Sequence, residues 1–446
     1  MKNPNLILIV LFSLLIQPVL MAQEDLTLTY EEAVKIALRE NLQIKQQENI
    51  LETSQAERAQ ALAAMAPSVN FGVTGQRIFG RQFDNTTGKF TEQQVNRLFG
   101  GLEADMTIFN GFARLNTIRQ TQNAAAAQIF QINQTKQDII FNVSQQYLQV
   151  LLNQELLRIA RANLEQQEEL AQSTATFVEA GIRNIADLYN QQSQARNAAL
   201  TVVDQENQLT VSKVQLIRTL QVDPFKAWDF AEPDLSKEVL LQEKVSIEEA
   251  YNSAIANRPD LKQQIKDIEA THYGLRAARG SYYPSLSLGY YLGSQYSNLD
   301  TANELEKQLF DVNKVNVISL NLRVPIFNNL ENRTFVQRNQ QQLDNAELDL
   351  EDLKRNIFEQ VQTAIADYET SQERIIAAEA QVKAAEKALE AERERFRLGV
   401  GDILDLNRVN ASYVEALATK AQADYQIIFQ KTALDYYQGL LQSSFE

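Results

Sequence analysis

Apolar residues recur every seven positions through two stretches of the chain, 113–180 and 331–398, and neither stretch contains glycine or proline. A seven-residue apolar period is the seam along which long α-helices pack, and each predicted helix is roughly 100 Å long at the usual helical rise. In both stretches a four-residue step interrupts the sevens, from Ile139 to Val143 and from Ile357 to Val361. Such a stutter locally relaxes a supercoil. The second stretch thus repeats the first at a displacement of 218, because Ile139 corresponds to Ile357.

Four shorter segments alternate between apolar and polar residues, as β-strands with one apolar face do. They span about 67–79 and 100–109 in the first half and about 284–296 and 315–327 in the second. Strands of this length fit either a soluble hairpin or an outer-membrane barrel. Four strands cannot close a membrane barrel, whereas three copies of the chain would supply twelve. A membrane interpretation therefore requires a trimer.

Two capping boxes predict the starts of helices of ordinary length. Thr29 with Glu32, and Ser246 with Glu249, have the spacing at which a hydroxyl accepts from the third helical amide and a carboxylate accepts from the cap amide. The two boxes lie at corresponding places in the two halves, so the duplication extends beyond the long helices.

Turn residues delimit the long helices. Asparagine-containing pairs at 110–111 and 328–329 lead from strand to helix, and Gly181 and Gly399 are typical of helix ends. We therefore expect a mainly α-helical chain with a small β part, built from a duplicated unit of strand, strand, long helix and long return helix. We expect a signal peptide at 1–22, a first repeat at 23–222, an irregular connector at 223–244, a second repeat at 245–438 and a tail at 439–446. The long helices of the first repeat are expected at about 111–180 and 183–222. Those of the second repeat are expected at about 330–398 and 402–438.

The N-terminus reads as a secretory signal. Lys2 precedes an apolar run from Leu6 to Ile16, and the small Ala22 supplies a cleavage site. A membrane anchor is the alternative, but the run is short for a bilayer span. The chain contains no cysteine, which excludes disulfides and a lipidated N-terminal cysteine. We expect export from the cytoplasm, with any membrane attachment supplied by the fold itself.

Composition argues against nucleic-acid binding and against catalysis. The formal net charge is −15, which does not suit phosphate neutralisation. The single histidine, His272, lies in a helical run, and no phosphate-binding loop, nucleophile elbow or metalloprotease spacing occurs. We expect no enzymatic activity, no cofactor and no metal site.

The ordered set of motifs resembles the TolC family of outer-membrane factors. The set consists of Pro-Ser at 67–68 and 284–285, Phe-Asn at 109–110 and 327–328, and a glycine followed six residues later by Asp187 or Asp405. The resemblance implies a trimeric twelve-stranded β-barrel in the outer membrane, continuing into an α-helical barrel across the periplasm. It also implies three kinds of partner: further copies of the chain with outer-membrane lipid, a periplasmic adaptor, and an inner-membrane pump of the RND, ABC or a similar class.

The resemblance also assigns roles to the two helical turns. The residues implied to dock the adaptor are Ala180, Gly181, Ile182, Leu398, Gly399 and Val400, and those implied at the periplasmic gate are Asp405, Asp402, Asp187 and Arg408. The chain departs from the family at Arg408, where a second acidic ring is usual, and at Phe396, where a tyrosine hydroxyl usually links the helix pairs. For Asp187 and Asp405, simple capping or solvation at a helix start is the alternative role.

These observations favour an outer-membrane exit duct that passively conducts substrates delivered by a pump and adaptor. The alternative is a secreted structural protein of the cell surface, built as a long coiled coil without a pore. The substrate is not encoded in a recognisable motif.

Overall fold

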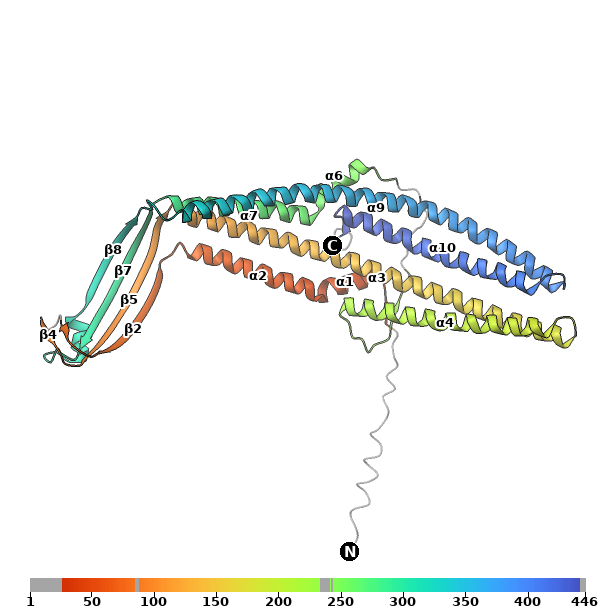
Figure 1. Ribbon diagram of the computed structural model, residues 1–446, viewed down its shortest axis with the longest axis horizontal. Helices are drawn as coiled ribbons and strands as arrows, with labels where there is room; N and C mark the ends of the chain where they lie inside the picture. Colours follow the sequence, from red (N-terminus) through yellow and green to blue (C-terminus); the bar gives the residue numbers. More distant parts are fainter. Residues whose placement is uncertain (1–25, 85–87, 233–240, 242–243, 442–446) are drawn as a thin grey trace, which may run out of the picture.

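The computed structural model describes residues 26–84, 88–232, 241 and 244–441, so the predicted signal peptide at 1–22 and most of the predicted tail lie outside the described residues. Long helices form an extended body with a β-sheet at one end and two helical turns at the other (Figure 1). The helices are α1 (Tyr30–Glu40), α2 (Leu42–Ala63), α3 (Ala113–Glu179), α4 (Ile185–Leu220), α6 (Ile247–Asn257), α7 (Pro259–Arg279), α8 (Leu305–Lys307), α9 (Glu331–Arg397) and α10 (Ile403–Tyr437), with a 3₁₀ turn η1 (Gly280–Tyr282) and a π turn η2 (Gln308–Val312). Among the described residues, no helix combines the length and apolarity that crossing a bilayer requires.

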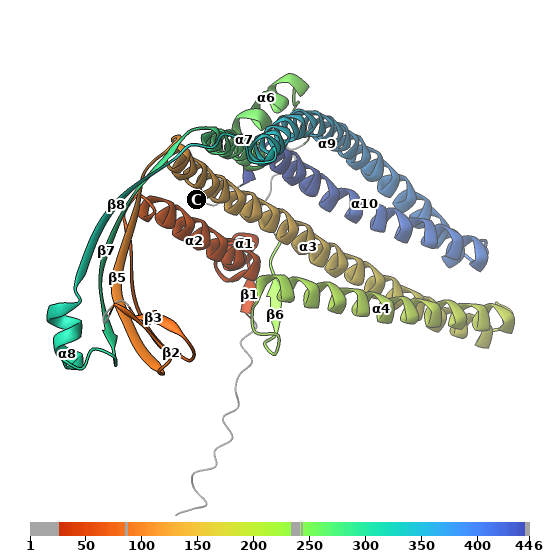
Figure 2. The same cartoon turned by 60° about the vertical axis from the view of Figure 1, so that its left-hand side comes forward.

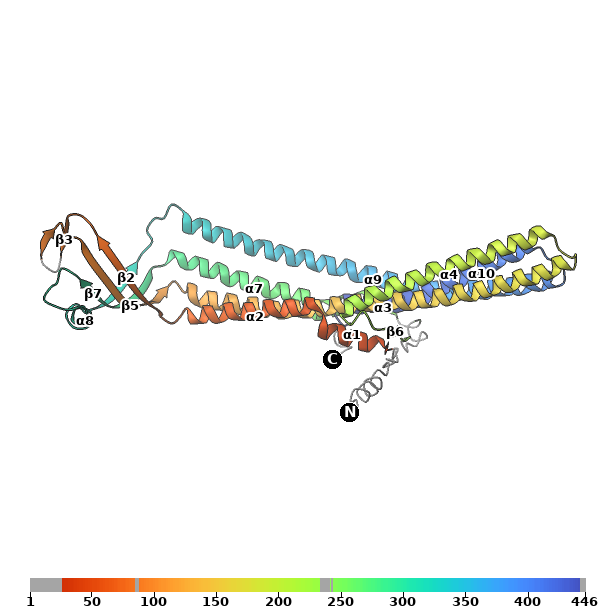
Figure 3. The same ribbon diagram turned by 90° about the horizontal axis from the view of Figure 1, so that it is seen from below.

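The two longest helices match the two seven-residue repeats. Both α3 and α9 run for 67 residues, and each packs against its own return helix, α3 with α4 and α9 with α10. Figure 3 shows α2 and α7 alongside the sheet-proximal halves of α3 and α9, and the return helices alongside the distal halves. The seam positions buried in the structure include Ile132, Ile139, Val143, Val150 and Leu157 on α3, and Ile357, Val361, Tyr368, Ile375, Leu389 and Phe396 on α9. The predicted packing seam is therefore the buried face of each long helix.

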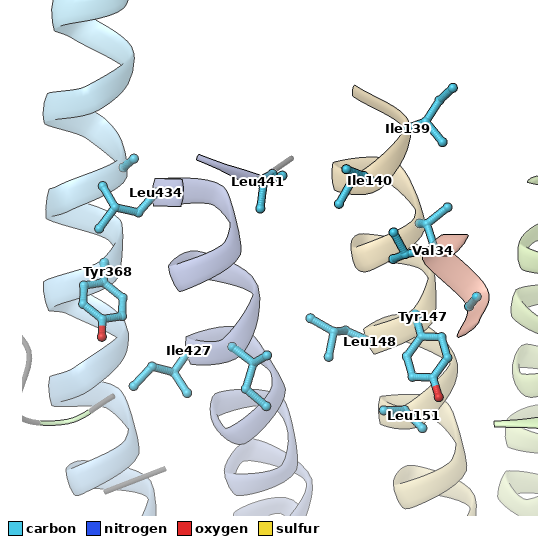
Figure 4. Packing of buried hydrophobic residues seen from close by; sticks show 14 of the residues in the cluster. Val34, Ile139, Ile140, Tyr147, Leu148, Leu151, Tyr368, Ile427, Leu434 and Leu441 are labelled. Carbon is cyan, nitrogen blue, oxygen red and sulfur yellow. The ribbon is translucent and has the colours of Figure 1, made fainter. Parts of the chain in front are cut away.

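The four-residue stutter lies in the main hydrophobic cluster. Ile139, Val143, Ile357 and Val361 are all buried there, together with Val34 of α1. Figure 4 shows part of this cluster, where side chains of α3, α10, α9 and α1 face one another. Both long helices thus change their packing period at the level where the short helices join them.

The strand-to-helix turns require unusual backbone. Gly111 and Phe112 have φ of 65° and 62°, and the corresponding Asn329 and Leu330 have φ of 53° and 65°. Two consecutive left-handed residues bend the chain between the strand and the helix (Figure 1), and three of the four carry a side chain, for which this backbone region is strained. The same geometry in both halves indicates that it is needed to place each long helix against the sheet.

One antiparallel sheet combines strands from both halves, in the order β2 (Ser68–Ile78), β5 (Val95–Asn110), β7 (Ser285–Ser297) and β8 (Val315–Arg323). Its register aligns Val69, Ala104, Tyr290 and Ile318 on one face. The next row, on the other face, contains Asn70, Glu103, Tyr291 and Val317. The sheet therefore has an apolar face and a more polar face, as the alternation predicted, and β2 and β8 form its two edges within one chain.

Two predicted strand limits were wrong. β5 begins at Val95 rather than near 100, because Val95 still pairs with Ile78 and the backbone N–H of Asn96 donates to Asn298 Oδ1 at 2.7 Å. β8 ends at Arg323 rather than at 327, and Pro325 explains this end, since proline lacks an amide donor and restricts the residue before it. The loops beyond the sheet contain a small hairpin, β3 (Gln82–Asp84) with β4 (Lys89–Thr91), and the short α8 and η2 turns.

The connector was predicted to be irregular, but it contributes a strand. β6 (Trp228–Phe230) pairs in parallel with β1 (Leu26–Leu28), and the fully buried Tyr147 of α3 holds both chain segments. The Tyr147 hydroxyl lies 2.9 Å from the carbonyl oxygen of Leu28 and 2.7 Å from that of Ala231. Burial raises the pKa of Tyr147 to about 12, so the hydroxyl keeps its proton for these contacts even in moderately alkaline solution.

Only one of the two predicted capping boxes is formed. The Thr29 hydroxyl accepts from the Glu32 amide at 3.3 Å, and the Glu32 carboxylate accepts from the Thr29 amide at 3.0 Å. Ser246 precedes α6 as predicted, but its hydroxyl makes no capping bond. α6 is held instead by packing, since its Ala250 and Ala254 are fully buried.

Candidate functional site at the helical tips

The candidate site is the pair of turns at the end of the molecule opposite the sheet (Figures 1 and 2). Gly181 and Gly399 end α3 and α9 with φ of 70° and 78°, a backbone region that side chains rarely adopt. The amide of Ile182 donates to the Phe177 carbonyl at 2.9 Å, and that of Val400 donates to the Arg395 carbonyl at 3.1 Å. These bonds satisfy the last carbonyls of each helix, so both glycines act as the predicted helix-ending residues.

The tips present apolar side chains to solvent. The exposed fractions are 63% for Ile182, 64% for Leu398 and 70% for Val400, which are three of the six residues assigned to adaptor docking. Ile185, Tyr189 and Leu404, near the starts of the return helices, are also at least half exposed, and they were not predicted from the sequence. In the sequence, each of these three is an apolar residue that lies near a helix start but outside the seven-residue packing seam. Apolar groups gathered at one exposed end are typical of a protein-binding surface.

The acidic residues at the tips occupy equivalent positions in the two halves. Asp402 caps α10 by accepting from the Leu404 amide at 3.1 Å, and Asn184 caps α4 by accepting from the Ala186 amide at 3.2 Å. Asp187 and Asp405 lie in the first turns of α4 and α10, where the helix dipole favours negative charge. Capping was the alternative role considered for Asp187 and Asp405, and in the structure it is Asp402 that caps the helix.

Arg408 pairs with Asp405 on the same helix rather than reaching another element. The Arg408 Nη2 atom lies 3.1 Å from Asp405 Oδ1, and the two side chains are 77% and 50% exposed. An ion pair this exposed contributes little to stability because water screens it. Within one chain, the side-chain contacts of Asp402, Asp405 and Arg408 are local, and none of them joins the two helix pairs.

One contact that joins the two tips comes from Arg183, which was not predicted as a site residue from the sequence. Its Nη2 donates to the Gly401 carbonyl oxygen at 2.7 Å, and its guanidinium carbon lies 4.7 Å from the centre of the Phe396 ring. A cation over an aromatic face is attracted by the ring quadrupole. Phe396 lacks a hydroxyl, yet it still links the helix pairs because its ring contacts Arg183 and, at 6.2 Å between centroids, Phe177.

Deeper between the helix pairs lies a layer of uncharged amide side chains. Gln191 of α4 is fully buried, donates to the backbone carbonyl of Gln167, and accepts from Asn407 of α10 at 3.0 Å. Asn410 of α10 donates to Asn163 Oδ1 at 2.9 Å and accepts from Gln166. Hydrogen bonds thus connect α3 and α4 to α10 without a charged group. Amide residues are common on helix surfaces, so the sequence alone did not distinguish these six from solvated ones.

The described residues at the tips form no cluster of metal-binding side chains. Among the described residues, no three His, Asp or Glu side chains gather in a way that would hold a metal ion. His272 lies on α7, with its ring centroid 5.7 Å from that of Tyr273.

A duplicated body of long helices with a half-apolar sheet at one end defines the architecture of a membrane duct. The chain belongs to the outer membrane efflux protein family, whose match covers residues 33–220 and 250–439, one segment in each half.

Known proteins of this kind resemble the chain over most of its length. It is 21% identical over 386 residues to the alkaline protease secretion protein AprF of Pseudomonas aeruginosa, covering 86% of this chain and 79% of that protein. It is 19% identical over 334 residues to the outer membrane efflux protein BepC of Brucella suis biovar 1, covering 75% and 70%. The crystal structure of the Campylobacter jejuni CmeC outer membrane channel superposes with a TM-score of 0.81 at 17% identity, covering 92% of this chain and 85% of CmeC.

The protein is accordingly an outer-membrane channel that extends into the periplasm and serves as an exit duct for efflux or secretion. Its family is one of channel proteins rather than of enzymes, and such a duct works with partner proteins. This agrees with the resemblance to the TolC family and excludes the alternative of a coiled coil without a pore.

Proposed function

We propose that three copies of the chain form the duct, with their sheets closing a twelve-stranded barrel and their helices forming one tunnel. The observation that carries this proposal is that the β2 and β8 edges have no strand partner within the described chain. An open sheet edge in lipid would leave amides and carbonyls without hydrogen bonds, which is prohibitive. Closure by three copies satisfies both edges and gives an even strand number.

The apolar face of the sheet supports placing it in lipid. Val69 and Phe71 on β2 are 59% and 73% exposed, and Ile318 and Leu320 on β8 are 75% and 64% exposed. All four belong to the same face according to the register. Lipid contact would bury these side chains, whereas water would leave a large apolar surface exposed.

The absence of cysteine makes a direct test of this arrangement possible. Asn70→Cys on β2 would be combined in turn with Val317→Cys, Ser319→Cys and Asn321→Cys on β8, all on the polar face. After oxidation in outer membranes, we expect one register to give a covalent trimer on denaturing gels. The control pairs Val69→Cys with Ser319→Cys, which lie on opposite faces. Monomers in every register would refute the trimer.

We also propose that the tips dock a periplasmic adaptor linked to an inner-membrane pump of the RND or ABC class. The proposed contacts are Ala180, Gly181, Ile182, Leu398, Gly399 and Val400, extended by Ile185, Tyr189 and Leu404. Support comes from their exposure and from relatives named for protease secretion and for pyoverdine export. A photo-crosslinking residue at Ile182 or Val400 should capture the adaptor in cells. The matched position Leu200, 64% exposed on α4 but remote from the turn, should not.

The gate is proposed to lie at Asp405, Asp402, Asp187 and Arg408, next to the tips. Three copies would bring these charges around one opening, where carboxylates raise the local concentration of cations. Current through the purified protein in planar bilayers tests this assignment. Asp405→Asn should change cation selectivity, while Asp349→Asn on an exposed face of α9 should not. Equal selectivity in all three proteins would remove Asp405 from the gate.

A further inference from the structure

A second feature of the wall is a cavity of about 520 Å³, far from the tips, between α3, α9, α10 and the start of α7. It lies where α10 ends against the beginning of α7. A Cβ added at Gly439 would lie 2.8 Å from the backbone nitrogen of Arg258, so these two helix ends are in close contact. The stacked helices leave the cavity beside their junction.

The cavity opens on the side of α9 opposite α6. Phe358 of α9 packs against Tyr251 of α6, with ring centroids 5.6 Å apart. Thr363 and Asp367, which line the cavity, lie roughly half a helical turn around α9 from Phe358 at about 100° per residue. Figure 2 shows α6 projecting away from the layer of long helices. Three copies of α6 would obstruct a tunnel, so in the proposed trimer α6 lies outside and the cavity faces the lumen.

The charge of the lining is negative. Arg258 is only 7% exposed, and its guanidinium is neutralised by Asp260 at 2.6 Å and also donates to Gln360 at 2.8 Å. Glu359 and Asp367 complete the charged lining, and neither forms an ion pair with another described side chain. They lie two turns apart on α9, roughly 12 Å along the helix. The cavity is thus bordered by two solvent-exposed carboxylates that have no ion-pair partner among the described side chains.

The rest of the lining is partly aromatic. Phe141, Phe429 and Tyr437 border the cavity, and the rings of Phe141 and Phe429 are 5.5 Å apart. Aromatic faces attract organic cations, and carboxylates attract any cation. The volume falls within the range of small-molecule sites, roughly 300–1,000 Å³.

We propose that this cavity is a transit site for amphiphilic organic cations, which would be a substrate class of the duct. The aromatic side chains would contact the apolar body, and Glu359 and Asp367 would neutralise the charge. Inorganic cations lack the apolar body, and organic anions would be repelled. The position of the cavity in the lumen rests on the proposed trimeric channel, whereas the binding itself does not.

Calorimetric titration of the purified full-length protein with tetraphenylphosphonium tests the site. The variant E359Q/D367N removes both carboxylates and should bind about tenfold more weakly, as expected for losing the water-screened attraction of two exposed charges. The control E369Q/E373Q removes two exposed carboxylates from the α6 side of the same helix and should bind within about twofold of the wild type. Equal weakening in both variants would mean that only overall charge attracts the probe, and would overturn the proposal.

Two further measurements separate shape from charge. Tetraphenylborate has the same shape as the first probe with a negative charge, and it should not bind. Thr363→Trp at an exposed lining position fills the cavity without changing its charge, and it should abolish tetraphenylphosphonium binding. Unchanged binding in Thr363→Trp, or no binding to the wild type, refutes the site. Cysteine crosslinking and bilayer conductance report the channel separately, so a conducting trimer that ignores the probe would refute this inference alone.

Discussion

The two tips share the same turn hydrogen bonds but carry different residues at the place where they touch. Arg183 and Gly401 are equivalent positions, 218 residues apart, and the Arg183 guanidinium donates to the Gly401 carbonyl. No side chain fits at Gly401, because an added Cβ would lie 2.8 Å from the Phe396 nitrogen and 3.0 Å from the Arg395 carbonyl carbon. A duplicated unit can pack against its own copy only if the two contact surfaces become complementary. At this contact the two halves therefore carry different residues, a hydrogen-bond donor on one side and an uncovered carbonyl on the other.

The largest effect is expected from adding a side chain on the glycine side of this contact. Gly401→Ala places a methyl group against backbone atoms that cannot move independently, and should destabilise the tip by about 2–3 kcal/mol. Hydrogen exchange at the 398–404 amides would measure the loss. Ala180→Ser at the other tip is the control, since it makes no such clash. Unchanged protection in Gly401→Ala would show that the tip adapts freely.

A slightly smaller effect is expected from the amide layer. Gln191→Ala removes the acceptor for Asn407 and a partner of Gln167 in a buried setting, which should cost about 1–3 kcal/mol. Faster exchange in the first turns of α10 and more frequent channel opening in bilayers would report it. The adjacent Gln192 is exposed, so Gln192→Ala should change neither quantity. Similar behaviour of the two variants would contradict a linking role for Gln191.

We expect the Arg183 side chain to stabilise the contact between the two tips by about 1–2 kcal/mol. Arg183→Ala removes one hydrogen bond and one cation–π contact, each of modest net value. A double-mutant cycle with Phe396→Leu isolates the ring contact from the bond to Gly401. A coupling energy of zero would show that the guanidinium and the ring do not interact in solution.

The smallest effect on stability is expected at Asp405. Its pair with Arg408 is exposed and lies within one helix, so Asp405→Asn should change the free energy of unfolding by less than about 1 kcal/mol, with any effect fading in high salt. Thermal unfolding at low and high ionic strength would measure this. A large, salt-independent loss would place Asp405 in a contact that the single chain does not contain.

The long helices, their stutter and the alternating strands could be predicted because each depends on local periodicity. Ile139 and Ile357 are buried because they belong to the seven-residue apolar seam, which lies on the packed side of each helix. Glycine at 181 and 399 marked the turns because a left-handed residue closes a helix at low cost. The end of β8 also has a local cause, since Pro325 lacks a backbone amide. It was predicted too late because apolar residues continue to alternate beyond Pro325.

The candidate site was harder to predict, because its contacts join residues far apart in the chain. Asp187, Asp402 and Asp405 were singled out by position relative to glycine, and the structure shows capping and first-turn roles for them within one chain. Arg183, Gln191 and Asn410 carry the links between the helix pairs, yet nothing local distinguishes them from solvated residues. The pairing of β1 with β6 was missed for the same reason.

The sequence by itself determined the helices, the strands, their duplication and the turns, because hydrophobic period and backbone preference act over a few residues. Only the tertiary structure decided which polar groups become partners, because hydrogen-bond geometry between Arg183 and Gly401, or between Gln191 and Asn407, exists only after both helix pairs are packed. The same holds for the cavity beside Arg258, which is formed by the meeting of four separate helices.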